Sequence, residues 1–267
     1  MGKDWIVMMM KAVACSLALL ALPAAAASPP GAGEAPERIA PRGPAIDSEA
    51  EAVLRAWSDY SRAVETAVFR VIDSIDDVQP DGQKIQFSHI REFTVVRPDK
   101  LKVVTTGDVR RRILWKDGKT LTVLDVEKNV YAQLPDPGTI AQAIDELQEK
   151  YGMSLPAADL LAGDVYETVT AGCDSIDYIG KNYAGEELCD HLAFTRKDID
   201  WQIWVSTGDQ PLLRKVVITY KEDPGEPQYT MRLLKVGDAP EIHDEVFDCE
   251  IPEGAERITF HPVEVSP

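Results

Sequence analysis

The chain has 267 residues, of which 45 are acidic and 28 basic, and its formal net charge is −17. Such an excess of negative charge repels nucleic acid and anionic lipid surfaces, so it argues against nucleic-acid binding and against electrostatic recruitment to a membrane. The length and a hydrophobic fraction of 45% suffice for one domain with a substantial core.

The N-terminus has the pattern of a secretory signal peptide. An apolar run from Ala12 to Leu22 follows Lys11, and an Ala-x-Ala site formed by Ala25 and Ala27 follows the run. The run is too short to span a membrane. We therefore expect residues 1–27 to be removed near Ala27 on export, leaving a periplasmic protein with no stable membrane insertion.

Residues 28–46 read as a linker. They are rich in Pro, Gly and Ala, a composition that cannot bury a core and favours disorder. We expect residues 47–267 to form a single domain.

That domain begins with a helix. Asp47 or Ser48 can cap it, and apolar residues then recur at helical spacing; they are Val53, Leu54, Trp57, Tyr60 and Val64. From Thr66 the period changes to two. A strand over 67–72 and a turn at 80–82 lead to a long partner strand over 85–96. One face of that partner should carry Ile85, Phe87, His89, Arg91, Phe93 and Val95.

The stretch from Phe93 to Pro135 predicts an antiparallel meander of five short strands, because tight-turn residues separate its apolar runs. Its register stays open. With a two-residue loop at Asp117-Gly118, Trp115 shares a face with Thr120 and Thr122. With a three-residue loop, Trp115 joins Leu121 and Val123, because a slip of one residue exchanges the two faces of a strand.

Helical signals follow the meander. Thr139 is a suitable cap, the apolar stripe comprises Ile140, Ile144 and Leu147, and Gly152 ends the helix. A second short helical stretch is expected over 155–161 and a further turn over 164–169.

The chain then returns to strands, predicted over 176–181, 187–194, 201–205, 212–220, 229–234 and, in strand-like form, 246–255. Strands in two blocks with helices grouped beside them indicate an α+β protein. So many short antiparallel strands favour a curved sheet or incomplete β-barrel with an N-terminal helix and a helical insertion.

The sequence contains no recognisable catalytic signature. His191 lies two residues from Cys189 on one predicted strand, where a buried thiol and a hydrogen-bonded histidine are the favoured interpretation. An oxidising compartment permits one disulfide among Cys173, Cys189 and Cys249, and the sequence does not choose the pair. We expect a non-enzymatic protein with no cofactor and no metal site.

Several segments resemble known families. Residues 97–101, 117–121, 130–131 and 247–255 resemble the lipoprotein-carrier (LolA/LolB-like) fold. Residues 137–140, 155–161, 189–194, 200–204 and 217–221 look like a bacterial predicted periplasmic family, domain of unknown function 2092. The resemblance implies an incomplete barrel around an apolar cavity closed by helices, and it implies no established activity.

These features lead to the hypothesis of a periplasmic protein that binds an acyl chain, a lipoprotein or another hydrophobic ligand in a half-barrel. The expected cavity residues are Phe87, Phe93, Val95, Trp115, Leu121, Val123, Tyr131, Trp201, Ile203, Tyr229 and Met231. The expected lid comprises Ile140, Ile144, Leu147, Leu160 and Leu161, and the expected anion contacts at the rim are Arg111 and Arg112. The alternative is a sensor or interaction module that docks an envelope protein without a ligand. The same residues would be plain core if the interior is filled.

Overall fold

The structure is a computed structural model that describes residues 45–136, 138–153, 155, 164–236 and 241–262. The predicted signal peptide, linker residues 28–44, Leu160 and Leu161 lie outside the described residues. No helix within these ranges is long and apolar enough to cross a membrane.

Two blocks of strands flank the helices α3 and α4, as expected. The helices are α2 (Ser48–Ala63), α3 (Ile140–Tyr151) and α4 (Val165–Thr170), and η2 (Asp244–Phe247) is a 3-10 turn. The first block comprises β2 (Thr66–Val78), β3 (Lys84–Val96), β4 (Lys100–Gly107), β5 (Arg111–Asp117), β6 (Thr120–Asp125) and β7 (Val130–Pro135). The second comprises β8 (Ser175–Ala184), β9 (Glu187–Thr195), β10 (Ile199–Ser206), β11 (Leu213–Tyr220) and β12 (Gln228–Val236). Two short strands, β1 (Ala45–Ile46) and β13 (Glu256–Arg257), complete the set.

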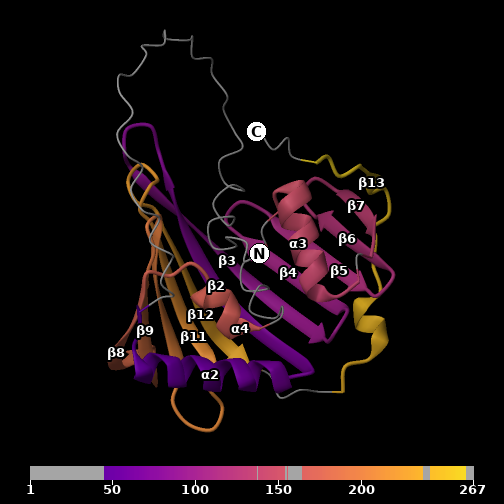
Figure 1. Ribbon diagram of the computed structural model, residues 1–267. Helices are drawn as coiled ribbons and strands as arrows, with labels where there is room; N and C mark the ends of the chain where they lie inside the picture. The colour runs from indigo at the N-terminus through magenta and orange to yellow at the C-terminus, as the bar shows by residue number, and fades with distance from the viewer. Residues whose placement is uncertain (1–44, 137, 154, 156–163, 237–240, 263–267) are drawn as a thin grey trace, which may run out of the picture.

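All these strands form one curved sheet in the order β1-β8-β9-β10-β11-β12-β2-β3-β4-β5-β6-β7-β13. Neighbours are antiparallel except at the two ends, where β1 and β13 run parallel to β8 and β7. The end strands are not paired with each other within the described chain, so the sheet stays open. Figure 1 shows the sheet bending around, with α3 in front of β4–β7. This is the predicted α+β incomplete barrel.

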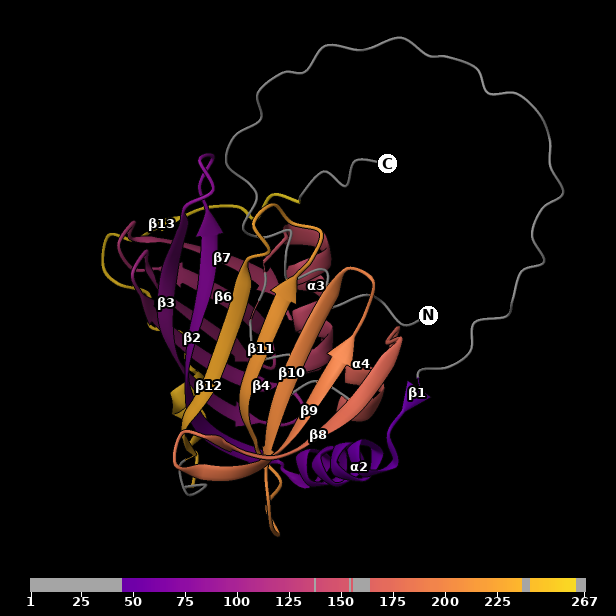
Figure 2. The ribbon, with the colours of Figure 1, turned by 90° about the vertical axis from the view of Figure 1, so that its left-hand side faces the viewer.

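Helix α2 lies across one end of the strands, near β8 and α4 (Figure 2). Asp47 caps it by accepting a hydrogen bond from the Glu49 backbone N–H at 2.8 Å. Leu54 and Trp57, from the predicted apolar stripe, are buried against the sheet core.

The structure differs from the predictions at two places near the chain ends. Ala45 and Ile46, assigned to the linker, form β1, because the Ala45 and Asp47 N–H groups donate to Asp174 and Ile176 on the β8 side. The predicted strand-like stretch 246–255 is instead η2 followed by irregular chain. Phe247 is 1% exposed, and η2 lies against β4 and β5, which are inner strands of the sheet, rather than beside an edge strand.

Candidate functional site

The concave face of the sheet carries a continuous apolar surface. Alternate residues of each strand point to it, and the register aligns them in rows such as Phe69, Phe93, Val103, Leu114 and Val123. On the other half of the sheet, Trp201, Ile203, Tyr229 and Met231 belong to the same buried cluster. The most exposed of the predicted cavity residues in this cluster is Val123, at 9%. These concave residues are therefore buried in the structure.

Helix α3 provides part of that cover. Thr139 and Gln142 form a reciprocal capping box at its start, and Gly152 ends it in a left-handed conformation. Its predicted stripe of Ile140, Ile144 and Leu147 is buried in the same cluster as the concave face. In Figure 2 the helix lies behind the strands, on the concave side. The structure thus brings the described lid residues and the concave apolar residues together.

A buried lysine fixes the start of α3. The Lys116 side chain is fully buried, and its Nζ donates to Asp136 at 2.8 Å, to the Asp99 carbonyl at 2.7 Å and to the Gly138 carbonyl. The Ile140 N–H donates to the Pro98 carbonyl at 2.8 Å. Because these bonds join the β3–β4 turn, β5 and the α3 N-terminus, they fix one end of the helix while its body rests on apolar contacts.

A charged group interrupts the apolar face in the middle of β2 and β3. Asp73 is 2% exposed and accepts two hydrogen bonds from Arg91, at 2.5 and 3.2 Å, and lies 3.2 Å from the His89 ring nitrogen. Burial alone would raise the pKa of Asp73, but the hydrogen bonds from His89 and Arg91 outweigh it and hold that pKa below its ordinary value. Asp73 is therefore an ionised, paired carboxylate inside the sheet.

The two predicted rim arginines point to opposite faces. Arg112 pairs with Thr105 and Asp125 in the same row as Arg91, so it lies on the concave face. Arg111 pairs with Thr106 and lies on the convex face. Only Arg112 is thus placed to contact a ligand in the concavity.

Two predicted cavity residues are also on the wrong face. The β5–β6 loop has two residues, Gly118 and Lys119, so Trp115 pairs with Thr122 and shares the convex face. Tyr131 pairs with Leu124 on that face as well. Leu121 and Val123 face the concavity as expected, and Phe87 lies half-buried on the extended β2–β3 hairpin. The β5–β6 register, which the sequence left open, decides the face of Trp115.

The convex face holds the histidine that invited a catalytic interpretation. The His191 ring stacks on Trp204 with centroids 4.0 Å apart, and its Nε2 lies 3.1 Å from Gln202 Oε1. Burial lowers the pKa of His191. Cys189 Sγ instead contacts the Glu187 carbonyl. This geometry agrees with a structural histidine packed on an aromatic ring.

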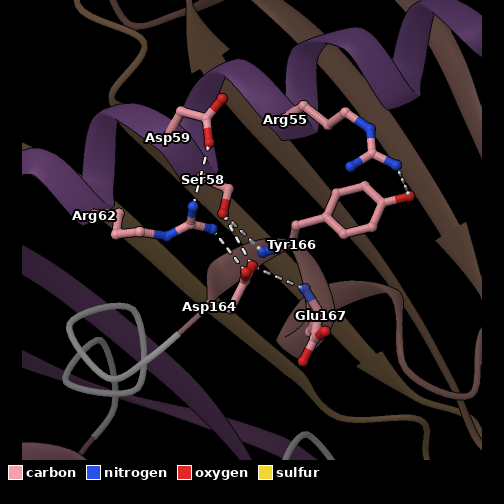
Figure 3. Close-up of a pocket in the computed structure, with 7 residues that line it drawn as sticks. All are labelled: Arg55, Ser58, Asp59, Arg62, Asp164, Tyr166 and Glu167. Atoms are coloured by element: carbon pink, nitrogen blue, oxygen red, sulfur yellow. Dashed lines mark hydrogen bonds and ion pairs between the residues drawn. The ribbon is translucent and has the colours of Figure 1, made fainter.

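A pocket of about 220 Å³ lies where α2 meets α4 (Figure 3). Asp164 caps α4 and accepts hydrogen bonds from Ser58 at 3.0 Å and Arg62 at 2.7 Å. Arg55 lies over the Tyr166 ring at 4.4 Å. The polar groups of the pocket are mostly engaged with one another, so we interpret it as the joint that attaches α4 to α2.

The three cysteines beyond the predicted signal peptide are free thiols. Cys173 is buried in the connection between α4 and β8, Cys189 is buried on β9, and Cys249 is half-buried. The disulfide that the sequence permitted is absent among the described residues. Nor do these residues include a group of three or more His, Cys, Asp or Glu side chains arranged for a metal ion.

A family model described as "Predicted periplasmic protein (DUF2092)" matches residues 50–261. The chain belongs to this family. The match confirms the resemblance seen in the sequence, and the family description is that of a periplasmic protein. No curated protein was found to match the chain.

Several solved structures share features of shape with this family member. An uncharacterized conserved protein from Thermus thermophilus is 7% identical, with a TM-score of 0.46 over 79% of this chain and 99% of that chain. The lipoprotein LppX from Mycobacterium tuberculosis is 10% identical, with a TM-score of 0.46 over 74% and 98%. A LolA superfamily protein from Nitrosomonas europaea is 12% identical, with a TM-score of 0.35 over 75% and 97%. These similarities are weak, and the fold assignment rests on the strand order and curvature.

Sequence reasoning did not identify two buried ionic groups of this family member. Lys116 borders the predicted Asp117-Gly118 turn, and lysine is rarely buried completely, so its sequence context does not mark it as a core residue. Asp73 gave no signal of its own, although Arg91 and His89 stood at alternate positions on an otherwise apolar face of the predicted partner strand. A basic residue on such a face indicates a buried acidic partner across the strand pair.

Proposed function

We propose that this protein is a periplasmic, non-enzymatic binding protein that holds an acyl chain, a lipoprotein acyl group or another apolar ligand against the concave face. The observation that carries the proposal is an open curved sheet whose concave apolar surface is covered in part by one amphipathic helix. A sheet that does not close on itself leaves room for α3 to move away without breaking a strand pair.

The apolar burial terms alone favour exchange of α3 for a long acyl chain. Burying a chain of about 16 carbons gains roughly 12 kcal/mol at about 0.8 kcal/mol per methylene group. Uncovering Ile140, Ile144 and Leu147 costs about 5–9 kcal/mol at 1.5–3 kcal/mol per side chain. A long apolar ligand therefore competes with the helix, whereas a short one does not.

The bonds of Lys116 set how α3 would move. They fix the N-terminal end of the helix, and Gly152 provides a flexible conformation at the other end. The helix would pivot about its first turn and swing its last turn outward. Such a movement keeps the buried ion pair intact while it opens the apolar face.

The experiment is mass spectrometry of organic extracts from the protein purified from an envelope fraction, followed by thermal melts of the extracted protein with fatty acids of increasing length. The proposal predicts a stoichiometric acyl-bearing compound and a melting temperature that rises with chain length. An extract without lipid, together with melts that no fatty acid or lipopeptide shifts, would overturn the proposal.

One observation favours the alternative of a protein-interaction module. Strand β8 pairs with β1 only at Ser175 and Ile176, and beyond them it exposes Ile179 at 51% and Tyr183 at 69%. A partner could add a strand at this edge. However, the register shift between Tyr178 and Gly180 places a bulge at Ile179, a feature that discourages edge pairing. Recovery of one stoichiometric envelope partner that is lost in Tyr183→Lys would favour this alternative.

A further inference from the structure

The concave face changes character along the strands. The row of Phe93, Val103 and Leu114 is apolar, and the next row along the same strands holds Arg91, Thr105 and Arg112. Successive residues on one face of a strand are about 7 Å apart. The distance from the apolar row to the row of Arg91 and Arg112 is therefore no longer than the first few carbons of an acyl chain.

Arg112 is the cation in this row with unused binding capacity. Its side chain is 35% exposed, its Nε is buried without a hydrogen-bond partner in the described structure, and the nearest carboxylate oxygen, of Asp125, lies 3.8 Å away. Burial and the charge of Arg110 lower the pKa of Arg112, the charge of Asp125 partly offsets them, and the charge of Arg91 lowers that pKa further. An oxyanion placed here would offset the repulsion from Arg110 and Arg91.

The acidic groups around this row are already engaged. Asp73 accepts two hydrogen bonds from Arg91, which also donates to Thr105 Oγ1 at 3.3 Å. Asp125 accepts from the Lys128 N–H at 3.2 Å through Oδ1, and its Oδ2 makes only a long ion pair, of 3.8 Å, with Arg112 Nε. In the neighbouring turns, Asp108 accepts from the Ser88 N–H and Glu127 from the Arg111 N–H. These bonds leave the Arg112 guanidinium short of a close counter-charge.

We infer that Arg112, with Thr105 and Arg91 beside it, binds the oxyanion head group of an amphiphile whose acyl chain lies along the apolar rows. This inference rests on the proposed function and narrows its ligand class to amphiphiles with a carboxylate or phosphate head. A guanidinium suits both heads because it presents parallel N–H donors. An uncharged acyl ester could accept a hydrogen bond from Arg112 but would supply no counter-charge.

The test compares oleate, lysophosphatidic acid and oleyl alcohol on the wild type, Arg112→Gln and Arg111→Gln. The Arg111 variant is a matched control, because it removes the same charge from the adjacent residue on the opposite face. We expect Arg112→Gln to weaken oleate or lysophosphatidic acid binding about ten- to a hundredfold, as for a charge-assisted hydrogen bond. Oleyl alcohol binding should be unchanged in every variant. The anion whose affinity falls further in Arg112→Gln identifies the natural head group as carboxylate or phosphate.

The outcomes separate this inference from the proposed function. If the wild type binds all three compounds and Arg112→Gln changes none, the head-group site is wrong and the apolar site stands. If the wild type binds none, both are wrong. If Arg112→Gln does not fold, the comparison of ligands on the wild type decides. The wild type should then bind oleate more tightly than oleyl alcohol, and rising salt should reduce that preference; equal affinities for the two compounds would overturn the inference.

Discussion

Lys116 is the residue whose replacement the structure predicts most sharply. Its ammonium group is fully buried and donates to Asp136, whose side chain is 5% exposed, and to two backbone carbonyls. Lys116→Met removes the donor and leaves a buried carboxylate without its counter-charge. Breaking a buried ion pair in this way costs about 3–5 kcal/mol. For a domain of this size, that loss corresponds to a fall in melting temperature of about 6–20 °C.

The assay is chemical and thermal unfolding of Lys116→Met beside Lys119→Met. Lys119 lies in the adjoining loop and is exposed, so its replacement should change the free energy of unfolding by less than about 0.5 kcal/mol. Lys116→Met should also bind an apolar dye more strongly, because the start of α3 is released. Equal stabilities for the two variants would refute the buried ion pair and the anchoring of α3.

Three further predictions concern the lid, the ionic group of the sheet and a thiol. Ile144→Asp should strongly weaken retention of an acyl ligand. It should destabilise the ligand-free fold by less than the roughly 2–5 kcal/mol typical of a packed core site, as thermal melts beside a lipid-binding assay will show. If the variant fails to fold, Ile144 is a core residue and the lid hypothesis is wrong. The pKa of Asp73 is lower in the folded state than in the unfolded chain, so its contribution to stability is complete above about pH 4 and is lost as the pH falls through the folded value. Asp73→Asn should therefore unfold more easily at neutral pH, because Arg91 loses its partner, and should show a flatter acid limb in denaturation curves than the wild type; identical acid limbs would contradict this pairing. Burial raises the pKa of Cys173 to about 12. This thiol should therefore react with a disulfide reagent at about pH 8 only after the protein unfolds. Fast reaction in the native protein would show that Cys173 is exposed.

The strands and helices could be predicted because each has a local signal. The Asp117-Gly118 turn, the period-two pattern of 85–96 and the capping box of Thr139 all lie within a few residues of what they specify. The meander, the helix over 140–151 and the open α+β sheet are confirmed.

The faces of the strands could be predicted only in part, because face depends on register. The β5–β6 loop comprises Gly118 and Lys119, a two-residue loop one position later than Asp117-Gly118. That loop length keeps Trp115 with Thr122 and separates it from Leu121 and Val123. Period two then assigns Arg111 and Arg112 to opposite faces. Buried ionic groups such as Lys116 with Asp136 stay hidden because both partners are typical turn residues, and only the fold brings them together.

The contrast between the two tryptophans of β10 tests the central claim, that an apolar ligand lies on the concave face. Trp201 belongs to the concave cluster and is 3% exposed, whereas Trp204 lies on the convex face against His191 and is 7% exposed. The two are thus similarly buried on opposite sides of one strand. Trp57 and Trp115 would be replaced by phenylalanine.

The measurement is fluorescence quenching by a brominated fatty acid in variants that retain only Trp201 or only Trp204. Bromine quenches at short range, so a chain held in the concavity should quench Trp201 and leave Trp204 bright. Equal quenching of the two, quenching of Trp204 alone, or no quenching of either at saturating fatty acid would contradict the account.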